Sequence, residues 1–295
     1  MTNAHHSLPA ETVVGGVTLD VADVDAQTAF YRDVLLLDVL ADRGATVELG
    51  RAAETLVTLR HRPDLPRGVR RSAGLYHTAL LHPDAAALAT TLASVAVHAP
   101  GLYTGAGDHL VSQAFYLDDP EGNGVELYVD RPRDQWRWQG GQIAMATLAI
   151  DPQAFLDEHL TDSARDFVAG DPGRRGTLGD ARVVGHVHLK VGDTARARDF
   201  YVDGLGFDVT AEMRGALFVS AGGYHHHLAM NTWESAGTGL RAPALGLGRV
   251  VVELPDADAV ARVAGRLRAR GLDVRDDGAA VEVDDPWGNL VRLAA

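Results

Sequence analysis

The sequence predicts an α+β protein built from four βαβββ units arranged as two pseudo-symmetric halves. The first observation is an internal repeat, because "TAFYRDVLLLDV" at residues 28–39 returns as "RDFYVDGLGFDV" at residues 198–209. The second is a repeated turn, "DPEGN" at 119–123 and "DPWGN" at 285–289. Self-similarity at a fixed offset, here roughly 170 residues, indicates duplicated structural units.

Each half divides again into two smaller units with the same order of elements. A stretch of alternating residues, typical of a strand, is followed by Asp and then by a helical stretch. The helix is clearest in "DAVARVAGRLRARG" at 258–271, which ends at Gly271. Short strands separated by Gly, Asp and Pro turns complete each unit. The units are placed at residues 13–60, 74–131, 183–233 and 246–294.

Along the chain the units group into an N-terminal domain at 1–131 and a C-terminal domain at 183–295. The segment between them, 132–182, is less regular and is expected to connect the two domains. Within it, "IAMATLAI" predicts one strand and "QAFLDEHL" predicts one helix, followed by a flexible connection.

The composition restricts the possible classes of protein. With 295 residues, 46% of them hydrophobic, the chain can bury a sizeable core. A net charge of −13 argues against nucleic-acid binding, which needs clustered cations. No cysteine is present, so any metal must be held by nitrogen and oxygen ligands. No apolar run approaches the roughly 18 residues of a membrane span. The N-terminus also lacks a signal-peptide pattern, so a cytoplasmic protein is expected.

Two histidines occupy equivalent positions in the opening strands of units two and three. His77 and His186 each precede a Leu by three residues and an Asp by seven. Gly16 holds this position in unit one and Arg249 in unit four. Two of the four equivalent positions can therefore bind a metal. Either histidine by itself is more often a hydrogen-bonded structural residue, but the recurrence favours a metal site.

The closing strands supply one further ligand. After "DPEGN" the third residue is Glu126, whereas after "DPWGN" it is Arg292, which cannot bind a cation. Two histidines and one carboxylate form a facial triad with open coordination positions. This set suits Fe(II), with Mn(II) as an alternative. Zinc also accepts these ligands, so the ligand set by itself does not select the metal.

Three consecutive histidines, 225–227, lie in the run "GGYHHHLAM". If they continue a strand, His226 faces opposite to His225 and His227, and at least one imidazole can lie near the metal. Such a histidine could act as a general base. The alternative is a solvent-facing pair and one core histidine. Two more candidates, His109 and Tyr116, lie upstream of Glu126, but strand alternation cannot place them across the intervening turn.

The repeated units, with "HVHLKVGD", "DPEGNGVELY" and "GGYHHHLAMNTW", resemble the vicinal oxygen chelate superfamily, which includes glyoxalase I, bleomycin-resistance proteins and type I extradiol dioxygenases. The whole chain is most similar to catechol-2,3-dioxygenases of the CatE type. The resemblance implies extradiol cleavage of a catechol by O₂ at a non-haem Fe(II) site, giving a 2-hydroxymuconic semialdehyde. It implies a small aromatic diol as substrate and no nucleic-acid or membrane partner.

The resemblance also implies roles for individual residues. His77, Glu126 and His186 correspond to the metal ligands, His226 to the acid/base residue, and His109 and Tyr116 to substrate contacts. The order departs from the family, in which the unit with the ligand and base precedes the unit with the ligand and carboxylate. We therefore expect units two and three to enclose one metal, with units one and four as the supporting pair. If the units pair otherwise, the site has to form in another way, such as between subunits.

Two alternative functions remain within the same fold. A glyoxalase-like metal lyase or isomerase typically uses two carboxylates and two histidines, so the predicted set of two histidines and one carboxylate argues against it. A non-catalytic binding protein of the bleomycin-resistance kind generally lacks the metal, and the intact triad argues against it. A homo-oligomer is compatible with the sequence, because symmetric assemblies are common.

Overall fold

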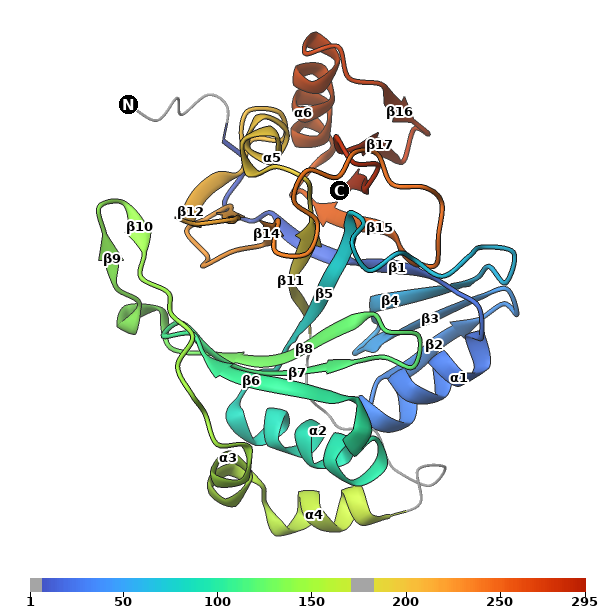
Figure 1. The fold of residues 1–295 in the computed structure, drawn as a ribbon, viewed down its shortest axis with the longest axis vertical. Helices are drawn as coiled ribbons and strands as arrows, with labels where there is room; N and C mark the ends of the chain where they lie inside the picture. Colours follow the sequence, from blue (N-terminus) through green and yellow to red (C-terminus); the bar gives the residue numbers. More distant parts are fainter. Residues whose placement is uncertain (1–6, 171–182) are drawn as a thin grey trace.

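A computed structural model describes residues 7–170 and 183–295, and it contains the four βαβββ units that the repeats predict (Figure 1). Unit one comprises β1 (Val13–Val21), α1 (Val24–Ala29), η1 (Phe30–Val34), β2 (Asp38–Asp42), β3 (Thr46–Arg51) and β4 (Glu54–His61). Unit two comprises β5 (Gly74–Leu81), α2 (Ala85–His98), η2 (Pro100–Leu102), β6 (Tyr103–Asp108), β7 (Ser112–Asp118) and β8 (Gly124–Asp130).

The second half of the chain repeats this order. Unit three comprises β11 (Val183–Lys190), α5 (Thr194–Tyr201), β12 (Asp208–Met213), β13 (Ala216–Ser220) and β14 (Leu228–Asn231). Unit four comprises β15 (Gly246–Glu253), α6 (Ala257–Ala269), β16 (Val274–Asp276), β17 (Ala280–Asp284) and β18 (Leu290–Ala294). In every unit an aspartate side chain accepts a hydrogen bond from the first turn of the helix, as a helix N-cap does; these residues are Asp23, Asp84, Asp193 and Asp256.

Among the described residues, the units combine into two eight-stranded sheets of the same topology. Units four and one form the order β16-β17-β18-β15-β1-β4-β3-β2, and units three and two form β12-β13-β14-β11-β5-β8-β7-β6. Each sheet is joined at its centre by two antiparallel opening strands, β15 with β1 and β11 with β5. Units two and three therefore share one sheet, as the site hypothesis requires. The boundaries of the two sequence domains remain a prediction.

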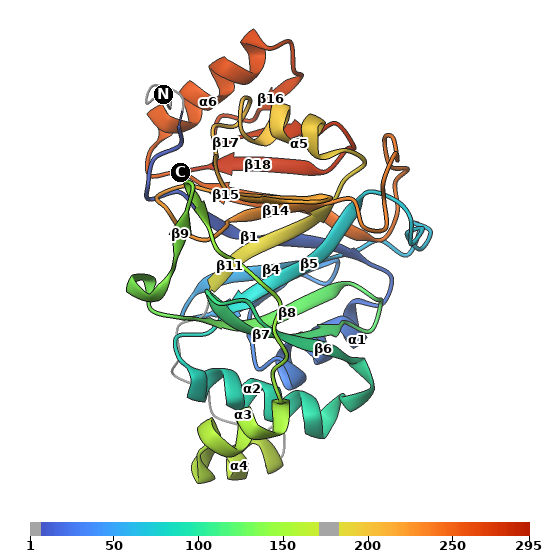
Figure 2. The same ribbon diagram turned by 60° about the vertical axis from the view of Figure 1, so that its left-hand side comes forward.

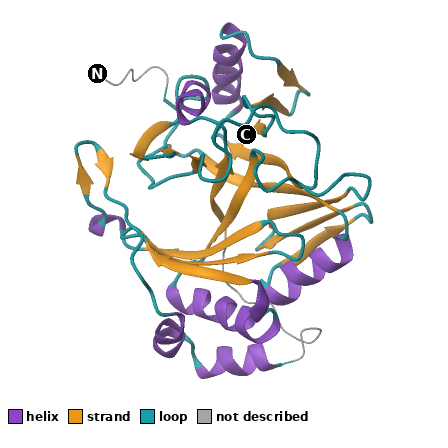
Figure 3. Ribbon diagram, viewed as in Figure 1, coloured by secondary structure: helices purple, strands orange, loops and turns teal. Residues whose placement is uncertain are grey.

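The helices lie outside the strands, and the two sheets meet in between (Figures 2 and 3). One core cluster of buried apolar side chains includes residues of all four units, among them Leu19, Leu127, Leu189 and Val250. The repeated turns bind this assembly together, because the Tyr31 hydroxyl donates to Asp119 at 3.3 Å. The Tyr201 hydroxyl likewise donates to Asp285, at 2.9 Å. Units one and two, and units three and four, are linked in this way across sheets.

The connecting segment is only partly as expected. The predicted helix is present as α3 (Pro152–His159), and a second helix, α4 (Asp162–Ala169), follows it. The predicted strand at 143–150 is wrong: only Ile143 belongs to a strand, in the hairpin of β9 (Trp138–Gln139) and β10 (Gln142–Ile143). Leu148 makes an isolated bridge to Asp108 instead. The predicted flexible connection falls at 171–182, outside the described residues. None of the described helices has the length and apolar character that a membrane span needs.

The histidine run also differs from the expectation of a continuous strand. The strand β14 begins only at Leu228, and His225–His227 lie in irregular backbone before it. Gly222 and Gly223 adopt positive φ angles of 61° and 69°, which turn the chain, so strand alternation does not apply. All three histidines are buried, which excludes a solvent-facing pair.

Candidate metal centre

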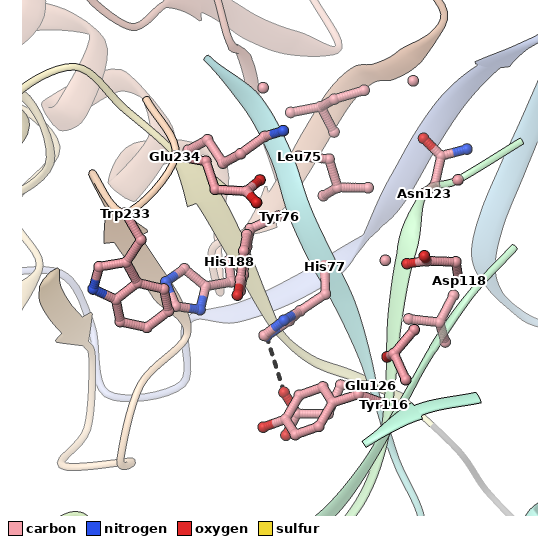
Figure 4. Close-up of a pocket in the computed structure, with 18 of the residues that line it drawn as sticks. Leu75, Tyr76, His77, Tyr116, Asp118, Asn123, Glu126, His188, Trp233 and Glu234 are labelled. Carbon is pink, nitrogen blue, oxygen red and sulfur yellow. Dashed lines mark ion pairs between the residues drawn. The ribbon is translucent and has the colours of Figure 1, made fainter. Parts of the chain in front are cut away.

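The three predicted ligands meet at the base of one cavity, on the sheet shared by units two and three. Figure 4 shows two of them, His77 and Glu126, with the contact between them dashed. His77 lies on β5, His186 on β11 and Glu126 on β8. The Nε2 atoms of His77 and His186 lie 2.9 Å and 3.2 Å from the same oxygen, Glu126 Oε2. The ligand atoms of these three residues all lie within 4.8 Å of one another, so one ion can reach all of them.

Strand pairing explains why these residues converge. Strand β5 pairs with β11 on one side and with β8 on the other, so the three ligands come from three adjacent strands. A register shift between Val184 and His186 forms a bulge, and such bulges redirect a side chain. Gly185 in this bulge lies against Tyr128, because an added Cβ would be 1.7 Å from the Tyr128 hydroxyl. This close contact explains why a glycine, which has no Cβ, precedes the ligand His186.

The protonation states of His186 and Glu126 are those that bind a metal ion. Burial, opposed in part by Glu126, lowers the pKa of His186 to about 4, so its imidazole is neutral at neutral pH. Burial raises the pKa of Glu126, but the neighbouring His186 and His77 outweigh it and hold this pKa well below its usual value. A neutral imidazole and an ionised carboxylate are the forms that bind cations.

The unpartnered Nε2 atom of His77 is a second indication that these residues bind a metal. His77 Nε2 is buried and, although it lies 2.9 Å from Glu126, it makes no hydrogen bond. A buried polar atom without a partner lowers the stability of a fold by about 1–3 kcal/mol, so a further binding partner for this nitrogen is expected. A cation between the two imidazoles and the carboxylate would satisfy it, and two histidines with one carboxylate form the facial triad of non-haem iron sites.

The predicted substrate contacts, Tyr116 and His109, adjoin the triad. Tyr116 on β7 is the direct cross-strand partner of Glu126 on β8, so both side chains face the cavity. The Nδ1–H of His109 donates to the Ala146 carbonyl at 3.0 Å. Its Nε2 is thereby left to accept from the Tyr116 hydroxyl at 2.6 Å. Burial and the charge of Glu126 raise the pKa of Tyr116 well above its usual value, so the phenol stays protonated.

The predicted acid/base residue, His226, packs against the ligand His186 with ring centroids 4.1 Å apart, and it lines the cavity. Burial and the surrounding imidazoles, His186 first, lower the pKa of His226 well below its usual value. The other two histidines of the run have different partners. His225 contacts Asp130 and His226, whereas His227 Nδ1 accepts from Ala221 N at 3.2 Å and stabilises the turn.

One buried histidine was missed by the sequence reasoning. His188 lies two residues after His186 on β11, lines the same cavity, and has its ring centroid 4.9 Å from that of His77. The Asn231 amide donates to His188 Nε2 at 3.0 Å, while Asn231 Oδ1 accepts from Trp233 N. The signal was present in "HVHLKV", because residues two apart on a strand share a face.

The cavity continues outward from the triad. Its volume is about 1080 Å³, and beyond His188 it is walled by Tyr76 and Trp233, whose rings are 5.5 Å apart (Figure 4). Charged groups follow at the outer end, where Glu234 pairs with Arg70 at 3.2 Å. The inner end thus offers metal ligands and hydrogen-bonding groups, and the middle offers aromatic surfaces to a flat substrate.

The equivalent place in the other sheet holds no such triad among the described residues. Arg249 and Arg292 occupy the positions of a strand-one ligand and of the closing carboxylate, and both pair with Glu282, at 3.5 Å and 3.2 Å. Guanidinium groups cannot bind a cation, so this pair of units supports the fold, as the sequence indicates.

The duplicated βαβββ fold and the two-histidine, one-carboxylate cluster define the class of protein. Residues 183–293 match the model of the Glyoxalase/Bleomycin resistance protein/Dioxygenase superfamily. The chain belongs to this superfamily, since it is also 37% identical to a member over nearly all of its length. That relative is Catechol-2,3-dioxygenase of Bacillus subtilis (strain 168), aligned over 298 residues, 97% of this chain and 96% of that protein.

Solved structures share the fold. A structure from Bacillus subtilis subsp. subtilis strain 168 superimposes with a TM-score of 0.66 at 14% identity, covering 98% of this chain and 86% of that one. Glyoxalase I from Zea mays superimposes with a TM-score of 0.57 at 15% identity, covering 96% and 92%. At these identities the likeness concerns the fold. The expected superfamily and α+β architecture are confirmed.

Proposed function

We propose that this chain is a catechol 2,3-dioxygenase, which opens the ring of a catechol next to its diol with O₂. The single observation that carries the proposal is the convergence of His77, His186 and Glu126 at the base of a large cavity. The relative with 37% identity along 97% of the chain, named Catechol-2,3-dioxygenase, supports the same reaction.

His77, His186 and Glu126 would hold the metal, with Fe(II) as the proposed ion and Mn(II) as the alternative. When bound, such an ion would supply Lewis acidity toward the diol and a path for electrons from the catechol to O₂. Glu126 is the one carboxylate among the three ligands, so a divalent ion held there would keep positive charge with which to bind an anionic diol.

The chain's own residues handle the protons and the orientation of the substrate. His226 borders the cavity beside His186 and, being neutral, can accept the proton of a diol hydroxyl and return it during ring opening. Tyr116, protonated and held by His109 at 2.6 Å, is placed to contact a substrate oxygen near Glu126. Tyr76 and Trp233 provide aromatic surfaces on which the ring of the substrate can pack.

The partners follow from this chemistry: a small aromatic diol and O₂, giving a 2-hydroxymuconic semialdehyde. A cytoplasmic location and assembly into a homo-oligomer remain predictions from composition and from the frequency of such assemblies.

The test is to load the full chain with Fe(II) without oxygen, add catechol, and then admit O₂. We expect O₂ uptake together with a yellow ring-fission product, and loss of both in Glu126→Gln. Glu282→Gln, a change in the sheet that lacks the triad, is the matched control and should retain activity. A fully iron-loaded protein that consumes no catechol would contradict the proposal, and tight catechol binding without turnover would instead indicate a binding protein.

A further inference from the structure

A chain of hydrogen bonds runs from the edge of the cavity to the end of strand β8. His225 Nε2 lies 2.9 Å from Asp130 Oδ1, and His225 Nδ1 lies 2.8 Å from His226 Nδ1. His225 is completely buried, whereas the Asp130 side chain is 23% exposed. The bonds therefore join a carboxylate near the surface, through a buried imidazole, to the candidate acid/base residue.

The carboxylate fixes the direction of the first bond, and a His225 that carries one ring proton then fixes the direction of the second. A carboxylate only accepts, so His225 must donate from Nε2 to Asp130. In a neutral imidazole the other nitrogen is then an acceptor, so His225 Nδ1 accepts the Nδ1–H of His226. The remaining nitrogen of His226, Nε2, consequently carries no proton and is the basic atom.

The surroundings keep the two imidazoles in this arrangement. Tyr224 packs on His225 with ring centroids 4.1 Å apart, and Trp136 covers it at 5.3 Å. Thr210 Oγ1 donates to the backbone carbonyl of His225 at 2.5 Å. No residue that the structure describes hydrogen-bonds His226 Nε2, and His226 lines the cavity, so this nitrogen is open to a substrate.

A second metal site is the competing interpretation, because His186, His225 and His226 also offer ring nitrogens within 4.8 Å of one another. Both nitrogens of His225 are already bonded, however, one to Asp130 and one to His226. A ligand nitrogen needs its lone pair for the metal, so the arrangement favours a hydrogen-bonded relay over a second ion.

We propose that Asp130 and His225 are positioning residues that hold His226 with its Nδ1 protonated and its unprotonated Nε2 toward the cavity. The proposal rests on the proposed function for its catalytic meaning, but the tautomer itself is a property of the protein. Partners of this kind fix the orientation of a catalytic or metal-bound imidazole by occupying its second nitrogen.

The first test measures the tautomer of His226 directly and does not depend on enzymatic activity. The full-length protein is labelled with ¹⁵N-histidine and examined by NMR at neutral pH, with and without Zn(II) as a diamagnetic occupant. The His226 signals are assigned by their loss in His226→Gln. We expect a protonated Nδ1 and a bare Nε2 in the parent protein, and a mixture of tautomers in Asp130→Ala. A proton on Nε2 in the parent, or no change in the variant, overturns the proposal.

The second test uses turnover of the Fe(II)-loaded protein. Asp130→Ala should lower kcat by about 10- to 100-fold, the range typical for outer partners of a site histidine, with KM and iron content unchanged. In the His226→Gln background the same change should cost nothing further, because Asp130 acts through His226. Equal losses in both backgrounds overturn the proposal, as does a second metal ion per chain.

Two further variants keep these tests decisive. His225→Phe removes both bonds and should match Asp130→Ala. If it does not fold, Asp130→Asn, which weakens the acceptor without removing its volume, takes its place. Asp284→Asn is the matched control, since Asp284 pairs with Arg275 at 2.8 Å in the other sheet and should leave both tautomer and kcat unchanged. If the parent protein shows no turnover at all, the proposed function fails, while the NMR result still decides the tautomer.

Discussion

His77 and His186 stand on neighbouring antiparallel strands with ring centroids 5.6 Å apart, although they belong to different halves of the sequence. Their Nε2 atoms approach the same oxygen of Glu126. The two histidines and Glu126 therefore lie close enough for one ion to reach all three.

Replacing Glu126 with Gln should abolish stable metal binding, because the neutral amide removes the charged ligand. Metal analysis after loading with Fe(II) should find close to one ion per chain in the parent and far less in the variant. Thermal unfolding provides an independent reading: a ligand at 100 times its Kd stabilises by about 2.7 kcal/mol, so added metal should raise the Tm of the parent only. Unchanged iron content in the variant would place the metal elsewhere.

Replacing Tyr116 with Phe should leave metal content intact and lower kcat/KM. The phenol donates to His109 and adjoins Glu126, so the loss is that of one hydrogen bond near a charge, about 1.5–3 kcal/mol or roughly 10- to 150-fold. Tyr103→Phe, a partly exposed tyrosine on β6, serves as control in steady-state kinetics. Equal effects of the two changes would remove Tyr116 from the site.

Replacing Gly185 with Ala should destabilise the fold, because the new methyl group would meet the Tyr128 hydroxyl at 1.7 Å. Overpacking of this kind costs about 1–3 kcal/mol, measurable by urea unfolding. Tyr128 packs on His186, so metal affinity should fall as well. Gly265→Ala in α6 is the control: nothing lies within 4 Å of its added Cβ, and helix propensity favours it by about 0.5–1 kcal/mol.

The metal-free protein should lose stability as pH falls below about 6.5. Burial lowers the pKa of His186 to about 4 and that of His227 to about 3. Between these values and the ordinary pKa of about 6.5, the unfolded chain binds protons that the folded chain does not. The free energy of unfolding therefore decreases as the pH falls through this range. Each such histidine contributes up to about 1.4 kcal/mol per pH unit. His227→Asn should reduce this slope in urea unfolding at pH 5 to 7, and an unchanged slope would contradict the assignment.

The repeats allowed the fold and the triad to be predicted. The alternation in "VGHVHLKV" and the recurrence of "DPxGN" place the unit boundaries within a few residues of the observed strands. Equivalence between repeats is a strong constraint, because a position in one unit predicts the same position in another. That equivalence led to His77, His186 and Glu126, which the structure brings together.

Contacts made by irregular backbone could not be predicted in this way. The turn at Gly222 and Gly223 removes the strand alternation by which His226 was expected to face opposite to its neighbours, and His225 bonds to Asp130 from another unit. The association of units two and three was expected from the ligands they carry, but the pairing of strand β5 with β11 that brings it about could not be derived from strand patterns. His188 is a different case, because its position two residues after His186 was readable and was overlooked.

The pairing of β5 with β11 determines when the metal site can form during translation. During synthesis the segment bearing His77 and Glu126 leaves the ribosome well before His186 has been made. The central strand β1 likewise cannot complete its pairing until β15, near the end of the chain, has been made. Ion capture by the complete ligand set is therefore a late event, after most of the polypeptide has been translated. Cells short of the ion should accumulate finished but empty chains rather than stalled ones.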